Sequence, residues 1–380
     1  MANQAGAFAR AARNAERKSV CQGGISLTSM LSYARAYASA YKFESANCRS
    51  IAFISLMEVM MSIARFQVDV PAGMKRIDGG AFLMGSEQFY PEEAPVRRVR
   101  VGSFLIDETP VTNAQFARFV SETGYVTVAE MPLSLADYPD MGAEAAMAGS
   151  SVFVMPGRDS GSDRHLSWWR FVQGAHWRCP LGPASDVAAL ADHPVVHIAW
   201  EDARAYASWA GKVLPSEAEW EFAARGGLDG KAFAWGDELA PQGRMLANYW
   251  QGAFPHTNLL LDGWERTSPV GSFPPNGYGL YDMIGNVWEW TEDWWALPDA
   301  VTVHGKSCCA RTDAHGGDEA RSCDAGDPAR VPRKVIKGGS HLCAPNYCQR
   351  YRPAARHPQA IDTGTSHIGF RCIIRLDSQD

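Results

Sequence analysis

The sequence predicts a loop-rich fold in which short helices and short strands are joined by long irregular segments. The 380 residues include 35 glycines, 22 prolines and 13 tryptophans, a composition that suits packed rings and turns rather than long helices. Apolar runs bounded by glycine are typical of short strands, and three segments carry helix-capping signals. The net charge of −6 provides no electrostatic footprint for nucleic acid, so we expect no nucleic-acid partner.

Residues 1–70 differ from the rest of the chain and are expected to form a helical extension, rich in alanine and serine, whose role is open. An overextended start codon is a second explanation for them. The first 18 residues have no apolar core of the kind found in secretory signals. The apolar run at residues 51–66 contains Glu58 and is too short and interrupted to span a bilayer comfortably, so we expect no membrane association. An odd count of nine cysteines without an export signal indicates mostly reduced thiols and a cytoplasmic protein.

From residue 71 onward the pattern is that of a folded domain. Residues 79–86 and 98–106 are expected to be strands. One helix should begin after Thr112, whose capping box with Gln115 precedes an apolar stripe ending at Gly124. A second helix is expected over residues 201–210, and a third after the capping box that starts at residue 216.

The segment of residues 233–295 contains many glycines, prolines, asparagines and tryptophans, and only short strands fit it. Loops of this length inside a compact domain are usually either stabilised internally, for example by a bound metal, or part of a functional site. Four well-spaced oxygen donors in it are suited to a hard cation such as Ca²⁺, although each taken singly is more often a turn or cap residue: Asn248, Asp262, Asp282 and Glu289.

Two cysteines in the C-terminal part, Cys343 and Cys348, are separated by four residues and followed by Arg350 and Arg352. Thiolates select soft ions such as Cu(I), and nearby positive charge lowers the pKa of a thiol. The spacing alone is at least as typical of a structural disulfide or of two buried thiols. A redox or soft-metal centre and a structural role therefore both remain open from the residues themselves.

Four segments together resemble the formylglycine-generating enzyme (sulfatase-modifying factor) family: residues 80–86, residues 193–200 leading into 214–221, residues 276–290, and residues 337–352 closing on 369–372. The resemblance covers roughly residues 71–377 and excludes the extension. It implies a compact α+β domain of the C-type-lectin-like kind, low in regular secondary structure. Most of these segments mark only the fold, whereas the cysteine pair after Gly-Gly-Ser distinguishes the oxidase.

The resemblance also implies metal sites. Cys343 and Cys348 would hold Cu(I), with Ser340 near the sulfur or oxygen species and Trp288 as a wall of the pocket. One structural calcium would be bound by the Asn248 side chain, the carbonyls of Tyr249 and Trp264, and Asp262. A second would be bound by Asp282, the carbonyls of Gly285 and Val287, and Glu289. Oxygen donors at these side-chain positions fit a hard cation.

The activity that the resemblance implies is oxidation, by O₂, of a cysteine in unfolded or nascent sulfatases to Cα-formylglycine. The target cysteine lies in a Cys-x-Pro-x-Arg segment and would enter as a third thiolate. Loss of a hydrogen from its Cβ would lead to a thioaldehyde, which hydrolyses to the aldehyde. A thiol or another reductant is required, and the sequence identifies neither it nor the sulfatase.

The chain departs from the family pattern at the disulfide positions of exported members. These read Ala207, Ala224 and Pro353 here, and Cys372 has lost its partner, which favours a reduced cytoplasmic protein. Another group, Cys308, Cys309 and Cys323 with two histidines nearby, lacks paired Cys-x-x-Cys spacing and is expected to bind no metal.

Three other functions share this domain. A non-catalytic lectin-like module, or an oxidase of another thiol, would use the fold without a sulfatase substrate. An iron-dependent sulfoxide synthase would need a histidine-rich site fed by an additional helical domain, and residues 1–70 contain no histidine. Three buried-type histidines near motif glycines and tryptophans, His193, His197 and His341, are expected to be structural.

Overall fold

The computed structural model describes residues 70–132, 147–156, 168–297 and 317–376. The helices are α4 (Asn113–Thr123), α5 (Trp200–Trp209), α6 (Glu217–Arg225) and α7 (Glu319–Ser322), with 3-10 turns η1 (Pro91–Glu93), η2 (Val128–Glu130) and η3 (Pro241–Gly243). The strands are β1 (Met74–Ile77), β2 (Gly80–Met84), β3 (Arg97–Val101), β4 (Phe104–Asp107), β5 (Gly149–Phe153), β6 (Trp169–Gln173), β7 (Trp288–Trp294), β8 (Arg333–Lys337), β9 (Arg356–Ala360), β10 (Ile368–Gly369) and β11 (Ile373–Arg375).

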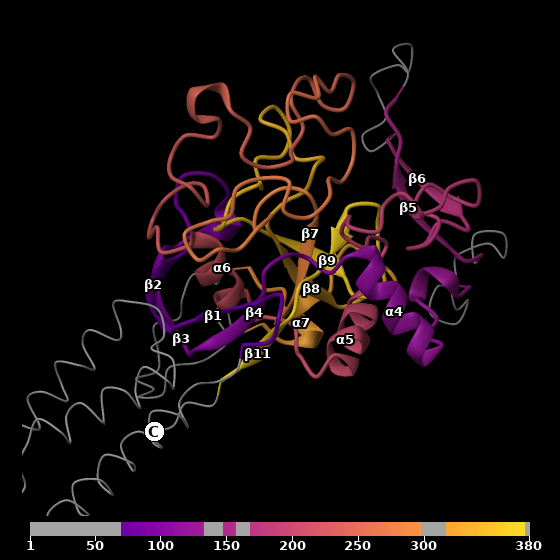
Figure 1. Cartoon of the computed structure of the whole chain (residues 1–380), viewed down its shortest axis with the longest axis horizontal. Coiled ribbons are helices and arrows are strands. Elements are labelled where there is room, and N and C mark those ends of the chain that lie inside the picture. Colours follow the sequence, from indigo (N-terminus) through magenta and orange to yellow (C-terminus); the bar gives the residue numbers. More distant parts are fainter. Residues whose placement is uncertain (1–69, 133–146, 157–167, 298–316, 377–380) are drawn as a thin grey trace, which may run out of the picture. The chain divides into compact units, whose positions relative to one another are not determined.

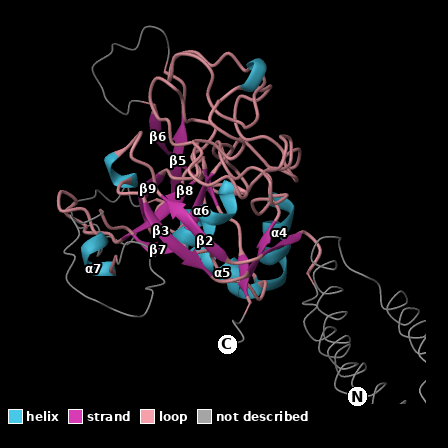
Figure 2. Cartoon of the chain, turned by 90° about the vertical axis from the view of Figure 1, so that its left-hand side faces the viewer, coloured by secondary structure: helices cyan, strands magenta, loops and turns pink. Residues whose placement is uncertain are grey.

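Long loops connect these short elements, as Figure 2 shows, so the predicted loop-rich α+β fold is confirmed. The expected extension lies almost entirely outside the described residues. No helix in the described part of the chain is both long enough and apolar enough to cross a bilayer.

The strands form four small sheets, drawn in Figure 1. In the three-stranded sheet, β4 pairs antiparallel with β1 on one side and β11 on the other, so the first and last described strands share one partner. The four-stranded sheet has the order β10-β7-β8-β9, with a parallel β10–β7 pair and antiparallel pairs elsewhere. The segment that carries the two cysteines leaves this sheet directly after β8.

The single strand predicted over residues 98–106 is two strands, β3 and β4, that belong to different sheets. The chain breaks its pairing at Gly102, where the backbone passes close to Gly79. A Cβ on Gly79 would lie 2.4 Å from the Gly102 carbonyl carbon, so only glycine fits there. A sequence pattern of alternating residues contains no signal for this change of partner.

The two predicted capping boxes are confirmed, whereas α5 begins and ends one residue before the predicted range of 201–210. Thr112 accepts a hydrogen bond from the Gln115 amide, the Gln115 side chain accepts one from the Thr112 amide, and Gly124 closes α4 in the left-handed conformation. Ser216 and Glu219 form the same reciprocal pair at the start of α6.

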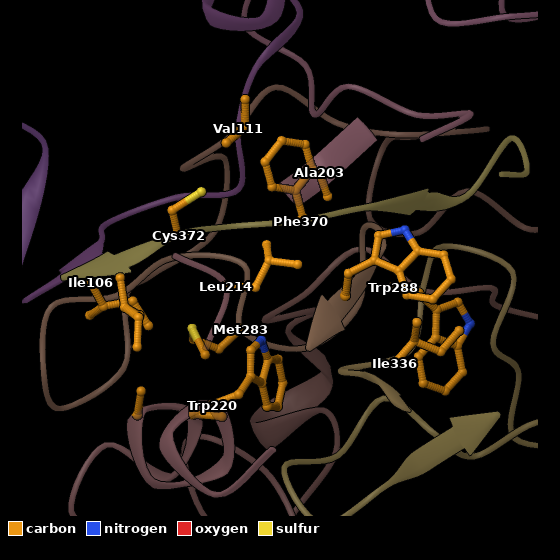
Figure 3. Packing of buried hydrophobic residues seen from close by; sticks show 14 of the residues in the cluster. Ile106, Val111, Ala203, Leu214, Trp220, Met283, Trp288, Ile336, Phe370 and Cys372 are labelled. Atoms are coloured by element: carbon orange, nitrogen blue, oxygen red, sulfur yellow. The ribbon is translucent and has the colours of Figure 1, made fainter. Parts of the chain in front are cut away.

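The core is rich in indole rings, and each needs a partner for its N–H when buried. Figure 3 shows Trp220 and Trp288 packed among aliphatic side chains such as Leu214 and Ile336. The Trp220 indole donates to Glu289 at 2.8 Å, and the Trp290 indole donates to the Ile198 carbonyl at 2.8 Å. These bonds tie α6 and the loop before α5 to β7, on the sheet from which the cysteine segment departs.

Candidate functional site

The cysteine segment begins with a sharp turn that requires glycine. Gly338 and Gly339 follow β8 with φ of +90° and +70°, the left-handed region that glycine adopts without a steric penalty. A Cβ on Gly339 would lie 2.7 Å from the Arg350 carbonyl oxygen. The turn therefore folds the segment back so that its beginning lies against its own end.

This turn brings the two thiols together, with Cys343 Sγ and Cys348 Sγ 3.2 Å apart and both free. The Cys343 amide donates to the Ser340 carbonyl at 3.0 Å, and the Cys348 amide donates to the Ala344 carbonyl at 2.9 Å. Cys343 is buried and Cys348 is partly exposed, so the pair can be reached from the Cys348 side. A soft, thiophilic ion is the cation that this donor set suits.

The two thiols have opposite tendencies to ionise. Burial raises the pKa of Cys343 well above its usual value. The hydrogen bond from the Cys343 thiol lowers the pKa of Cys348 to about 6, against the effect of burial and with help from the Arg350 guanidinium. Arg350 Nη1 lies 4.0 Å from Cys348 Sγ. The pair is thus arranged to hold a single negative charge, on the more exposed sulfur.

The two arginines after the cysteines anchor the segment to η1. Arg350 pairs with Glu92 at 2.5 Å and lies over the Tyr90 ring at 3.9 Å. Arg352 and Glu93 form a fully buried bidentate pair, and burial raises the pKa of Glu93 although Arg352 opposes this. Both arginines therefore have carboxylate partners, and Arg350 additionally approaches the thiol.

Ser340 is buried and lies next to Cys343. Its amide donates to Cys343 Sγ at 3.5 Å, and its hydroxyl oxygen accepts from the Leu342 amide at 3.2 Å. Ser340 therefore shapes the loop around the buried sulfur. A separate hydrogen bond from the hydroxyl to a reacting group stays a prediction.

Trp288 lies at the start of β7, where its amide donates to the His367 carbonyl at 2.9 Å and its ring is 5.7 Å from that of His357. None of its described contacts is with either thiol. Its role as a wall of the pocket therefore stays a prediction.

An aromatic cluster beside the thiols was missed by the sequence reasoning. Tyr347 stacks on Phe254 with ring centroids 4.6 Å apart, and Trp168 meets both rings edge-on. Asn346 and Phe254 exchange two hydrogen bonds of 3.3 Å, which hold the cysteine segment to the loop after residue 250. The position of Tyr347 directly before Cys348 was the one available signal.

The residues of the first predicted calcium site lie together. The Tyr249 carbonyl and the Asp262 carboxylate both accept from the Gln251 side-chain amide, and Asp262 also accepts from the Trp264 amide at 3.0 Å. The contact from Gln251 to the Tyr249 carbonyl is shorter than an ordinary hydrogen bond. The Tyr249 carbonyl and the Asp262 carboxylate thus face one position, which the Gln251 amide nitrogen occupies, and oxygens of this kind suit a hard cation such as calcium. The Asn248 side-chain nitrogen donates to the Arg266 carbonyl.

The second predicted calcium site fits less well. Both oxygens of Glu289 accept from the buried Arg371 guanidinium, at 2.7 and 2.8 Å, and one also accepts from Trp220. Asp282 accepts from the Gly271 amide at 2.7 Å. A cation there would have to displace Arg371 from Glu289 or rely on Asp282 and the carbonyls of Gly285 and Val287.

The three histidines predicted to be structural are buried. Both ring nitrogens of His197 have hydrogen-bond partners, and one ring nitrogen of His193 has one. His197 contacts the Ser150 hydroxyl at 2.8 Å and the Pro180 carbonyl at 2.9 Å, and His193 contacts Thr267 at 3.0 Å. His341 reaches the Asn286 carbonyl through Nδ1 at 2.8 Å, whereas its buried Nε2 has no partner. Of the other cysteine group, Cys308 and Cys309 lie outside the described residues. The described part of the chain contains no cluster of three or more His, Cys, Asp and Glu side chains able to hold a metal.

Comparisons with known proteins agree with this architecture. Residues 61–376 match the model of the sulfatase-modifying factor enzyme 1-like domain. The formylglycine-generating enzyme of Mycobacterium tuberculosis is 52% identical over 297 residues, covering 78% of this chain and 96% of that protein. The mouse (Mus musculus) inactive C-alpha-formylglycine-generating enzyme 2 is 40% identical over 311 residues, covering 79% and 84%.

Among solved structures, PvdO from Pseudomonas aeruginosa is similar with a TM-score of 0.51 and 25% identity, covering 80% of this chain and 94% of that one. The family match spans most of the chain and includes every residue of the thiol site. The chain therefore belongs to the formylglycine-generating enzyme (sulfatase-modifying factor) family, as its motifs predicted.

Proposed function

We propose that this protein is a copper-dependent oxidase that converts the cysteine of a Cys-x-Pro-x-Arg segment in unfolded sulfatases to Cα-formylglycine. The observation that carries this proposal is the pair of free thiols 3.2 Å apart, one buried and one accessible. A relative that is 52% identical is named for this activity, which supports the assignment.

In the proposed reaction Cys343 and Cys348 hold Cu(I), whose soft character suits two thiolates. When bound, copper supplies the redox chemistry through which O₂ is used. Overall, one substrate thiol, one O₂ and two reductant thiols yield the aldehyde, H₂S, water and one disulfide. Written this way, atoms and electrons balance, and the external thiol is the required reductant.

The chain's own residues prepare this centre. Arg350, held by Glu92, favours the thiolate of Cys348, while Ser340 fixes the position of the buried Cys343 sulfur. The buried surroundings of Cys343 exclude water, which protects reactive species from side reactions. Tyr347, half exposed and stacked on the buried Phe254, presents one aromatic ring directly before Cys348 in the chain, where a substrate chain would be positioned.

The calcium ions that the family resemblance implies would be structural. In the proposal Asn248, Tyr249, Asp262 and Trp264 hold one, on the loop that Asn346 ties to the cysteine segment. We further propose a cytoplasmic setting, in which the remaining thiols stay reduced.

The test is to incubate the Cu(I)-loaded protein with a short Cys-x-Pro-x-Arg peptide, a thiol reductant and air, and to follow the peptide mass. A loss of about 18 Da is expected from conversion of CH₂–SH to CHO. Cys343→Ser and Cys348→Ser should abolish it, and Cys323→Ser, which replaces a free cysteine outside the cysteine segment, is the matched control that should retain it. No mass change with the copper-loaded protein would refute the oxidase assignment for this substrate class.

A second function, that of a non-catalytic binding module, is favoured by the relative named inactive. It predicts that no Cu(I) binds and that both cysteines can be replaced without loss of function. Thiol titration with and without Cu(I) separates the two. Protection of two thiols that disappears in Cys348→Ser supports the oxidase, and unchanged reactivity of all thiols supports the module.

A further inference from the structure

We propose that the loop of residues 257–263 is a docking surface for apolar side chains of the unfolded polypeptide substrate, at a distance from the target cysteine. This inference rests on the proposed function. We call residues 257–263 the leucine loop. Three consecutive leucines lie in it, with exposed fractions of 57%, 42% and 63%: Leu259, Leu260 and Leu261. Single exposed leucines are ordinary, but three consecutive ones place an unusual amount of exposed apolar surface on one short loop.

Specific hydrogen bonds hold the leucine loop in one conformation. The Leu259 amide donates to the Gln251 carbonyl at 2.6 Å, and the Asn258 side chain accepts from the amides of Gln251 and Leu260. Leu260 has a φ of +52°, a left-handed conformation that is unfavourable for a side chain with a Cβ. The fold thus maintains a strained backbone that presents apolar side chains to solvent, a combination typical of binding sites.

The loop is continuous with the thiol site. Its base carries Phe254, which stacks on Tyr347 and exchanges hydrogen bonds with Asn346, two residues before Cys348. The Trp250 amide at the same base donates to the Cys343 carbonyl at 3.0 Å. Summed backbone and ring dimensions keep the leucines within about 30 Å of Cys348, a span that roughly ten extended residues cover. One substrate chain can therefore reach both places.

The chemistry of the loop favours a polypeptide over a membrane. Residues 257–263 contain no Lys or Arg, the side chains that attract a protein to anionic lipid surfaces, and the exposed Glu265 follows them. A folded sulfatase would bury its own apolar side chains, whereas an unfolded chain offers them together with the target cysteine. The surface therefore also explains how the enzyme would favour unfolded over folded substrate.

The experiment compares kcat/KM for three peptides that share a Cys-x-Pro-x-Arg segment: one short, one with a ten-residue apolar extension and one with a polar extension. We expect the full-length, Cu(I)-loaded protein to prefer the apolar over the polar extension. In the Leu259→Ser/Leu261→Ser variant this preference ratio should fall about ten-fold, from the loss of two partly buried leucine contacts. Leu228→Ser, another exposed leucine, is the control that should keep the ratio.

The outcomes separate the two proposals. Conversion of the short peptide without any preference for the apolar extension overturns the docking surface and leaves the oxidase intact. Failure to convert all three peptides overturns the oxidase. Two other results would also overturn the inference if the double variant keeps the peptide preference. Loss of sedimentation with anionic or neutral vesicles in that variant would assign the leucines to a lipid surface. Loss of dimerisation in solution would assign them to contact with a second copy of the chain.

Discussion

Replacing Glu93 by glutamine should destabilise the protein far more than its position in a short 3-10 turn suggests. Both Glu93 oxygens accept from Arg352, and both side chains are almost fully buried. Arg352 also donates to the Gln349 carbonyl at 2.7 Å and lies 3.6 Å from the Phe89 ring centroid. Glu93→Gln keeps the shape of the side chain but leaves a buried guanidinium without a counter-charge.

The expected loss is about 3–5 kcal/mol, the usual consequence of removing one partner of a buried ion pair. This is a large part of a typical total stability of about 5–15 kcal/mol. The intact pair itself adds little, because the cost of removing both charges from water offsets most of their attraction. Glu93→Gln/Arg352→Met, which removes both charges, should therefore recover part of the loss.

Urea unfolding followed by tryptophan fluorescence measures these free energies. Glu92→Gln is the matched control, because its pair with Arg350 is partly exposed and should contribute about 1 kcal/mol. If Glu93→Gln stays within about 1 kcal/mol of the parent protein, or if the double variant is less stable than the single one, the reasoning about an uncompensated buried charge is wrong.

Three further predictions follow from the site. Ser340→Ala should cost about 1–3 kcal/mol in urea unfolding, because the buried Leu342 amide loses its acceptor; an unchanged midpoint would contradict this. Stability should fall as the pH drops below about 6.5, since burial lowers the pKa of His197 to about 4 and the unfolded state then binds more protons. Unfolding at pH 5 and 7.5 measures this, and the difference should shrink in His197→Gln. Calcium chelation should lower Tm by several degrees in the parent protein and much less in Asp262→Asn; equal shifts in both would exclude Asp262 as a ligand.

The sequence by itself determined the local structure wherever the signal is local. Capping boxes at Thr112 and Ser216 place two helices correctly, because their hydrogen bonds join residues three apart. The glycines before the cysteine segment and the family motifs indicated the thiol site for the same reason: its two sulfurs, its turn and Ser340 lie within one short stretch of chain.

Only the tertiary structure decided which distant segments meet this stretch. Glu92 and Glu93 pair with Arg350 and Arg352 across more than 250 residues, and Phe254 stacks on Tyr347 across more than 90. Nothing in the spacing of the chain encodes such partners, because they depend on how sheets and loops pack. Long-range packing also determines that the chain changes strand partners at Gly102 and that Arg371 pairs with Glu289. Hydrogen bonds between residues close in the chain can therefore be predicted from the sequence. The charged and aromatic side chains around the reactive thiol depend on long-range packing, so only the tertiary structure identifies them.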